Sequence, residues 1–217
     1  MKLEEANVKL NKLSRVRFGD LFSDEDMNTI ILNKGKTGQL LELSLGMNLS
    51  NTNLDFEDGE LKTNKCDANG KPIETIFITQ ISSVIDELIQ EKTFEETHLY
   101  EKIRNILYVP VCKVGEPKDW MFLPSIHIDL REPKFAELKD IWKEDYYSIC
   151  KQLKSHIENS EDGFIHTSNG LHIQVRSKDS KPYHPIYSDI YKRYVSNKNH
   201  AFYFQKKFVE DIKKLNF

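Results

Sequence analysis

Cysteine is scarce in this chain, and long apolar runs are missing altogether. The three cysteines are widely spaced and include no Cys-x-x-Cys pair, so neither a disulfide framework nor a zinc site is indicated. No apolar run approaches the length of a membrane span, and the first residues lack the apolar segment of a signal peptide. We therefore expect a cytoplasmic protein with no membrane partner.

An overall excess of positive charge is also missing, which at first argues against nucleic-acid binding. The formal net charge is -3, but residues 1–100 carry 11 Lys and Arg against 18 Asp and Glu, whereas residues 164–217 carry 10 against 4. A basic C-terminal third could face phosphates while the acidic part holds a metal ion. An ordinary solvated surface accounts for the same numbers equally well.

What the chain does contain is enough apolar material for a sizeable core, because 39% of its 217 residues are hydrophobic and 11% are aromatic. Periodicity predicts a mixed α/β chain without internal repeats. Helices are expected over about 4–14, 23–32, 36–46, 82–90, 94–104 and 134–158, with another at the C-terminus. Extended segments are expected over about 60–65, 73–81, 105–112, 121–130, 164–167, 171–175 and 202–204.

Turn residues predict how some of these strands pair. The segment Asp67–Pro72 is a strong turn signal, so we expect 73–81 to pair with 60–65 as a hairpin. An Asn-Gly turn predicts a second hairpin that ends at Arg176. Four tyrosines follow it, and we expect them to pack on the core rather than to stack on bases: Tyr183, Tyr187, Tyr191 and Tyr194.

The stretch Leu54–Thr63 carries the strongest local indication of chemistry. In a strand, residues two apart share a face, so Glu60 and Lys62 would lie together. Asp55 precedes a tight polar turn that would fold it back beside Glu60. Two carboxylates and an ammonium suit Mg²⁺ and an oriented water molecule, which is the equipment for phosphodiester hydrolysis.

A Glu-x-Lys triplet by itself is weak evidence, because this chain contains four of them. The copies that begin at Glu116 and Glu132 have a central proline, which removes a donor from any strand ladder. The copy at Glu137 lies in a helical pattern, where residues two apart do not face each other. Only the copy at Glu60 follows an Asp and a turn. A further carboxylate, Glu42, stands in a leucine-rich segment, either at an exposed edge or beside the metal site.

Taken in order, several stretches resemble the MutH-like endonuclease family, which comprises mismatch-repair MutH and related type II restriction enzymes that cut GATC. The resemblance spans nearly the whole chain. It is carried by Lys34–Glu42, Asp55–Lys62, Gly70–Thr75, Lys102 with Ile106–Val111, Ile173–Arg176, and Ala201–Tyr203 with the lysines that follow. Two departures are a shorter gap between Asp55 and Glu60 than in MutH, and Ser177 where MutH has a proline.

The resemblance implies an α/β fold with a restriction-endonuclease-like PD-(D/E)xK core, in which a mixed sheet is flanked by helices and two arms surround a DNA cleft. Residues 1–217 would form a single nuclease domain with an N-terminal catalytic lobe and a C-terminal DNA-reading lobe. Double-stranded DNA would be the partner and Mg²⁺ the cofactor.

The resemblance also assigns roles to residues. Asp55, Glu60 and Glu42 would ligate Mg²⁺, and Lys62 would position the attacking water. Arg176 would enter the major groove, where a guanidinium pairs bidentately with guanine. Further residues expected at the DNA or near the site are Lys102, Tyr203, Lys34, Lys178, Lys206 and Lys207.

A sequence-specific, Mg²⁺-dependent DNA endonuclease follows, in one of two forms. The first is a type II restriction enzyme that makes double-strand cuts at GATC or a similar short site. The second is a mismatch-repair nicking endonuclease that a MutL-type partner activates. A catalytically silent DNA-binding domain is the third possibility, against which the four residues of the acidic site argue.

Overall fold

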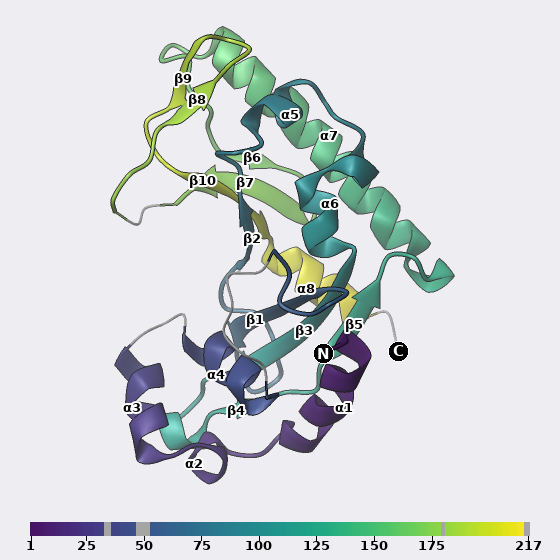
Figure 1. The fold of residues 1–217 in the computed structure, drawn as a ribbon, viewed down its shortest axis with the longest axis vertical. Coiled ribbons are helices and arrows are strands. Elements are labelled where there is room, and N and C mark those ends of the chain that lie inside the picture. Colours follow the sequence, from purple (N-terminus) through teal and green to yellow (C-terminus); the bar gives the residue numbers. More distant parts are fainter. Residues whose placement is uncertain (33–35, 47–52, 179–180, 215–217) are drawn as a thin grey trace. The chain divides into compact units, whose positions relative to one another are not determined.

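The structure is a computed structural model that describes residues 1–32, 36–46, 53–178 and 181–214 (Figure 1). The chain divides into two compact units. The first unit comprises Met1–Glu74 and Arg104–Asp129, and the second comprises Thr75–Ile103 and Leu130–Phe217. Within the described ranges, no helix combines the length and apolar character that crossing a membrane requires. The single domain and its arms around DNA stay predictions.

The described part of the first unit begins with four helices, of which the first, third and fourth match predicted helices and the short second one was not predicted. The loop before the third helix supplies a cap, because the Ser23 hydroxyl accepts a hydrogen bond from the Asp26 backbone N–H at 3.2 Å. The helices are α1 (Leu3–Leu13), α2 (Phe18–Leu21), α3 (Asp24–Leu32) and α4 (Lys36–Ser44).

The sheet of the first unit is mixed, as predicted, but one expected pairing is wrong. Strand β1 (Glu60–Cys66) pairs in parallel with β3 (Asn105–Cys112). Strands β4 (Met121–Phe122) and β5 (Ile126–Asp129) both pair antiparallel with β3. The expected hairpin of 60–65 with 73–81 does not form, because β2 (Ile76–Gln80) pairs with β10 (His200–Phe204) instead. Beside β1, the returning chain makes only a single bridge, between Cys66 and Pro72.

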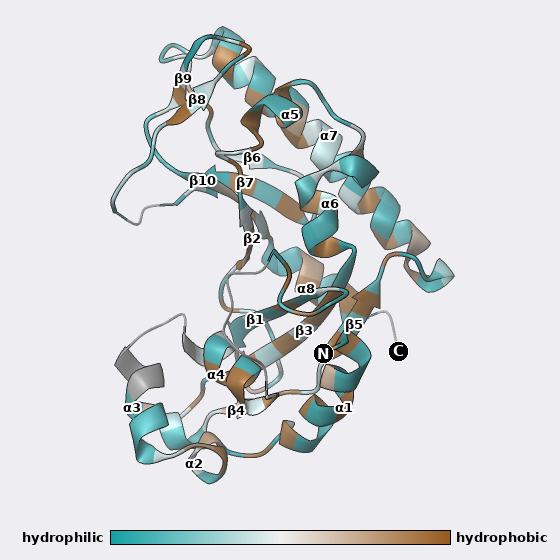
Figure 2. Ribbon diagram, viewed as in Figure 1, coloured by the Kyte–Doolittle hydropathy of each residue, from teal (hydrophilic) through white to brown (hydrophobic). Residues whose placement is uncertain are grey.

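One face of this sheet carries the core of the first unit. Leu61 and Leu107 are opposite each other in the ladder, so both point to the same face. They pack in one cluster with apolar residues of α1 and α4, including Leu10 and Leu41. Every residue of β3 is buried, and brown, hydrophobic stretches mark its ribbon in Figure 2. Glu60 and Lys62 alternate with Leu61 and therefore point to the other face.

The second unit contains a four-stranded antiparallel sheet in the order β2-β10-β7-β6 and a separate β8–β9 hairpin. Strand β6 is Ser168–Asn169, β7 is Ile173–Ser177, β8 is Ile186–Ser188 and β9 is Arg193–Ser196. The helices are α5 (Ile85–Ile89), α6 (His98–Ile103), α7 (Ala136–Asn159) and α8 (Lys206–Ile212), and short 3-10 turns are η1 (Phe94–Glu96) and η3 (Pro133–Phe135). The long predicted helix is α7, which buries residues such as Trp142 and Leu153.

A carboxylate on α7 holds the turn of the β6–β7 hairpin. Asp145 is only 5% exposed. It accepts hydrogen bonds from the backbone N–H groups of Leu171, His172 and Ile173 at 2.5, 2.7 and 2.8 Å. Gly170 lies so close to this carboxylate that a Cβ would overlap it, which explains the glycine of the predicted Asn-Gly turn. The strands of this hairpin lie slightly later in the sequence than expected.

We expect Asp145→Asn to destabilise the protein by about 2–4 kcal/mol, because an amide NH₂ would face backbone donors in a buried site. The free energy of unfolding, measured by urea titration, tests this prediction. Asp140→Asn, which changes an exposed carboxylate of the same helix, should stay within about 0.5 kcal/mol of the wild type. Equal stability of the two variants would contradict the role given to Asp145.

Candidate active site

A tight turn brings Asp55 back to the start of β1, as predicted. The Phe56 backbone N–H donates to the Gly59 carbonyl at 2.9 Å, which closes the turn. A Cβ on Gly59 would overlap the Asn105 carbonyl of β3, so only glycine allows this close approach. Asp55 then accepts a hydrogen bond from the Leu61 backbone N–H at 2.9 Å. Two strands and one turn thus fix the position of the first carboxylate.

Glu60 and Lys62 form a buried ion pair at the start of β1. The Lys62 Nζ lies 2.6 Å from the Glu60 Oε2. The two residues are only 3% and 8% exposed. Because burying either charge alone is costly, the pair holds both side chains in one geometry. The contact that two-residue spacing predicted is therefore present.

Glu42 of α4 is electrostatically part of the same site. Burial, followed by the negative charges of Asp55 and Glu60, raises the pKa of Glu42 from 4.5 to about 7, although Lys62 opposes the shift. Burial and then the Glu60 charge also raise the pKa of Asp55, which shares a side-chain hydrogen bond with Glu60. Three carboxylates against one ammonium leave an excess of negative charge here. The structure thus brings all four predicted catalytic residues together.

This donor set fits Mg²⁺ by its chemistry, because carboxylate oxygens are the ligands that this ion prefers. A divalent cation would also relieve the carboxylate repulsion that, after burial, contributes to the raised pKa values of Glu42 and Asp55. The ligands are not preassembled, however. Among the described residues, no three His, Cys, Asp or Glu side chains already surround one point as metal ligands.

In the second unit, the predicted DNA-reading residues gather on one face of the antiparallel sheet. The Arg176 guanidinium lies over the Tyr203 ring at 4.4 Å from its centroid. Arg176 Nη2 also donates to the Thr75 hydroxyl at 3.0 Å. The Tyr203 ring contacts the Phe77 ring at 5.7 Å between centroids, and the Lys178 ammonium lies 5.3 Å from the Phe77 ring centroid. We call Arg176, Lys178, Tyr203 and Phe77 the Arg176 cluster.

Phe77 is the residue of this cluster that sequence reasoning missed. It is 42% exposed between the buried Ile76 and Ile78. An aromatic residue on the face that strand alternation leaves to solvent was the available signal. The ring contacts both Tyr203 and Lys178, so it supports two residues that the sequence did single out.

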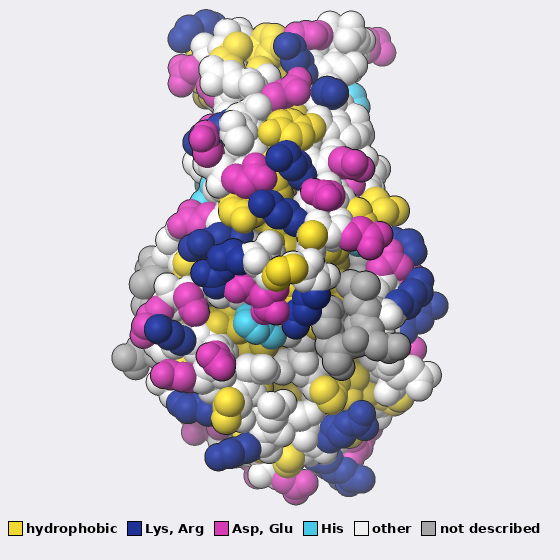
Figure 3. Space-filling view, turned by 90° about the vertical axis from the view of Figure 1, so that its right-hand side faces the viewer, with side chains coloured by type: hydrophobic (Ala, Val, Ile, Leu, Met, Phe, Trp, Pro, Cys, Tyr) yellow, Lys and Arg dark blue, Asp and Glu magenta, His cyan; other side chains and the backbone are white. Residues whose placement is uncertain are grey.

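The remaining predicted cations do not belong to the Arg176 cluster. Lys206 and Lys207 are exposed on α8, and Lys207 already pairs with Asp211 at 2.7 Å. Lys102 is half-buried on α6. Lys34 lies outside the described residues. On the face drawn in Figure 3, basic and acidic side chains are interspersed, so that face carries no large patch of a single charge.

Comparison with known proteins shows which family this chain resembles. Residues 46–120 match the family model described as "DNA mismatch repair enzyme MutH". The DNA mismatch repair protein MutH of Shewanella woodyi is 30% identical over 158 residues, which cover 65% of this chain and 64% of that protein. The MutH of Buchnera aphidicola subsp. Baizongia pistaciae is 26% identical over 204 residues, or 87% of this chain and 84% of that protein.

These matches confirm that the chain is MutH-like. The segment that the family model matches contains Asp55, Glu60 and Lys62 together with β1 and β3. The MutH-like chain spans just under two thirds of the Shewanella protein.

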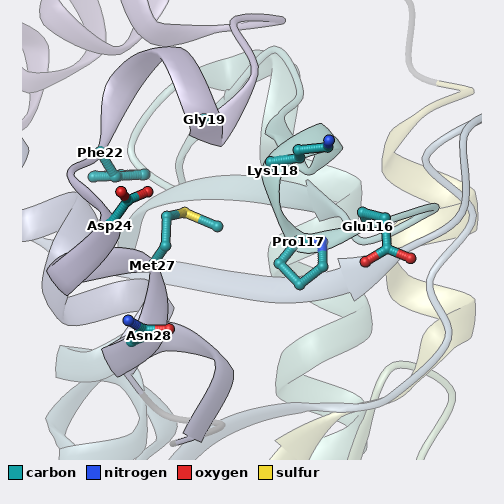
Figure 4. A pocket seen from close by; sticks show the side chains of 8 residues that line it. All are labelled: Gly19, Phe22, Asp24, Met27, Asn28, Glu116, Pro117 and Lys118. Carbon is teal, nitrogen blue, oxygen red and sulfur yellow. The ribbon is translucent and has the colours of Figure 1, made fainter.

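One hollow in the first unit of this MutH-like chain does not involve the acidic site. It encloses about 650 Å³ and is lined by residues of α2, α3 and the 3-10 turn η2 (Pro117–Asp119) and by their neighbours (Figure 4). Met27 points across it from α3, while Asp24 and Glu116 stand at opposite ends. None of the four catalytic candidates lines it, so its size has no bearing on the chemistry.

Proposed function

We propose that this chain is a Mg²⁺-dependent DNA endonuclease of the mismatch-repair type. The observation that carries the proposal is the convergence of Asp55, Glu60 and Lys62 with Glu42, in a chain whose matched segment belongs to the MutH family model. Carboxylates beside a buried ammonium suit phosphodiester hydrolysis better than any other reaction that this chain offers.

Each residue of the acidic site has a distinct task in the proposed reaction. Asp55, Glu60 and Glu42 would hold Mg²⁺, which when bound would stabilise the charge on the attacking and leaving oxygens. Lys62 is fixed by Glu60 through one of its three donors. Its other N–H groups would orient the water that attacks the phosphorus and would stabilise negative charge on the phosphate. Burial of this pair strengthens both effects.

The Arg176 cluster supplies the proposed DNA contact. Tyr203 and Thr75 hold the exposed Arg176 from two sides, so less side-chain entropy is lost when the guanidinium meets a base edge. A bidentate contact with guanine would follow from this preorganisation, and GATC remains the proposed site. Phe77 and Lys178 would then meet the same DNA segment.

The comparisons favour nicking in mismatch repair over restriction, because the family model and the relatives carry the name of mismatch-repair MutH. We expect the purified chain with Mg²⁺ to nick supercoiled GATC plasmid slowly, and a MutL-type activator to accelerate the reaction. Agarose gels distinguish the open-circular product from a linear one. Rapid linearisation without a partner would support the restriction enzyme, and DNA binding without any cleavage would leave the silent binding domain.

A further inference from the structure

Three of the four tyrosines that follow Arg176 are exposed, which corrects our expectation that they pack on the core, whereas Tyr191 is half-buried and its hydroxyl donates to Glu158 at 2.7 Å. Tyr183, Tyr187 and Tyr194 are 41%, 45% and 57% exposed. Strands β8 and β9 are short and pair mainly with each other, so their outward side chains have no layer above them in the described part of the second unit. Tyr187 and Tyr194 lie on the β8–β9 hairpin and Tyr183 precedes it, so the three exposed rings are accessible to a partner.

Two lysines from distant points of the chain converge on one of these rings. The Lys181 ammonium lies 5.9 Å from the centroid of the Tyr183 ring, and the Lys198 ammonium lies 5.6 Å from it. Within the described residues, neither ammonium has an ion-pair partner. The ring face attracts both cations and limits their motion, while their N–H donors remain free to meet an anion.

The backbone around Lys198 is fixed and is joined to the Arg176 cluster. The Ser196 hydroxyl accepts the Lys198 N–H at 3.1 Å and donates to the Lys198 carbonyl at 2.8 Å. The Lys178 N–H donates to the Asn199 carbonyl at 2.8 Å. Lys178 of the Arg176 cluster is therefore joined to the segment of Lys198 by a backbone hydrogen bond.

A polar hollow of about 300 Å³ opens beside Lys198. Thr167 and Ser177 contribute hydroxyl groups to its lining and Asp162 contributes one carboxylate, whereas the Ser196 hydroxyl in the same lining already donates to the Lys198 carbonyl. That carboxylate is already engaged, because it accepts hydrogen bonds from the Phe164 backbone N–H and from Ser160 and lies 3.1 Å from a His166 ring nitrogen. Hydroxyl donors next to an ammonium without an ion-pair partner among the described residues create an environment suited to a phosphate group.

We propose that Lys181, Tyr183 and Lys198 form a second contact with the DNA, directed at its phosphate backbone and independent of base sequence. This proposal rests on the proposed nuclease function. The cation-bearing ring extends the DNA-contacting surface beyond the Arg176 cluster, and the tyrosine holds the two ammonium groups in place for adjacent phosphates. Such contacts fix the register of a protein on the duplex while the arginine reads bases.

The test measures the salt dependence of DNA binding by the full chain. Fluorescence anisotropy would follow a labelled duplex of about two helical turns, either with a central GATC or with that site scrambled, in Ca²⁺ and between about 50 and 200 mM salt. For the Lys181→Gln/Lys198→Gln variant we expect the slope of log K against log salt to become shallower by about 2. The loss of affinity should be equal on both duplexes. Arg176→Ala should instead lose affinity mainly on the GATC duplex.

Three controls keep the two proposals separate. Lys151→Gln/Lys154→Gln removes two exposed lysines of α7 and should leave the slope unchanged. Tyr183→Phe keeps the ring and should bind as the wild type does, whereas Tyr183→Ala should weaken binding on both duplexes. An unchanged slope in the Lys181/Lys198 variant, with normal binding by the wild type, would overturn this inference alone. Failure of the wild type to bind either duplex would overturn the nuclease proposal as well.

Discussion

Replacing Lys62 by alanine should lower the rate of DNA cleavage by about a thousandfold at saturating Mg²⁺, while DNA affinity stays within a few-fold of the wild type. The reason is that Lys62 is held beside the three carboxylates, with its Nζ 2.6 Å from the Glu60 Oε2. Removing it takes away the proposed water-orienting charge and leaves the metal ligands. Single-turnover cleavage of a GATC duplex is the measurement.

The control for this prediction must address folding, because Lys62 is buried. Without it, Glu60 would be an uncompensated carboxylate that is 3% exposed, which costs about 3–5 kcal/mol when no cation replaces the ammonium. Thermal melting of Lys62→Ala in EDTA and in Mg²⁺ separates a loss of fold from a loss of chemistry. Lys65→Ala, at a half-buried position of the same strand, should cleave normally. Normal cleavage by a folded Lys62→Ala variant would exclude the proposed mechanism.

The part of the site that could be predicted from the sequence is the part that is local. Asp55, Glu60 and Lys62 lie within one turn and one strand, so strand alternation and a tight turn sufficed to place them together. Their burial could not be predicted in the same way. It depends on β3 and α4 packing around β1, and residues far away in the sequence decide that. Glu42 therefore entered only through the resemblance and its leucine-rich surroundings.

Strand partners were the main failure at the level of the fold. The turn Asp67–Pro72 is present, and the Ile73 N–H donates to the Lys65 carbonyl at 2.9 Å, so the chain does reverse beside β1. It then leaves, and the parallel partner of β1 is β3, about 40 residues later in the sequence. A continuous apolar run such as Ile106–Val111 indicates a strand buried on both faces. It does not show which other strands pair with that strand. Local patterns identify extended segments, whereas pairing is a property of the whole unit.

The Arg176 cluster shows a different limit. Arg176 and Tyr203 are far from Phe77 in sequence, and the register of β10 against both β2 and β7 places them on one face. No spacing rule connects these positions. The exposed tyrosines were misjudged for the same reason, because the composition of a loop does not show whether another layer of structure covers it.

Glu42→Gln should stabilise the metal-free protein at pH 8 and at the same time lower Mg²⁺-dependent cleavage by about a hundredfold. The pKa of Glu42 is about 7 in the folded protein and 4.5 as its ordinary value. The folded state therefore binds more protons than the unfolded state between these values, and the stability of the wild type falls as the pH rises from 4.5 to 7. Because Glu42 is half-buried, we expect a change of about 1–2 kcal/mol, less than a fully buried carboxylate would show.

The glutamine in Glu42→Gln has the shape of glutamate but cannot ionise, so this variant does not lose stability through ionisation at position 42 as the pH rises. In EDTA, the variant and the wild type should have equal free energies of unfolding near pH 4.5, and the variant should be more stable at pH 8. Adding Mg²⁺ should reverse the order, because a ligand that binds only the folded state stabilises it more as its affinity rises, and the wild type has one more carboxylate for the ion. Glu5→Gln, at an exposed position of α1, should follow the wild type throughout.

The two halves of this prediction depend on one cause, which makes it a sharp test. If the carboxylates repel one another at a site that binds a divalent cation, Glu42→Gln must raise the stability of the metal-free protein and lower its metal-dependent activity. A variant that loses stability at pH 8 in EDTA would show that Glu42 makes a structural contact instead. If the difference in unfolding free energy between the wild type and Glu42→Gln in EDTA does not change between pH 5 and 8, the raised pKa of Glu42 is excluded, and the proposed Mg²⁺ site loses its electrostatic basis.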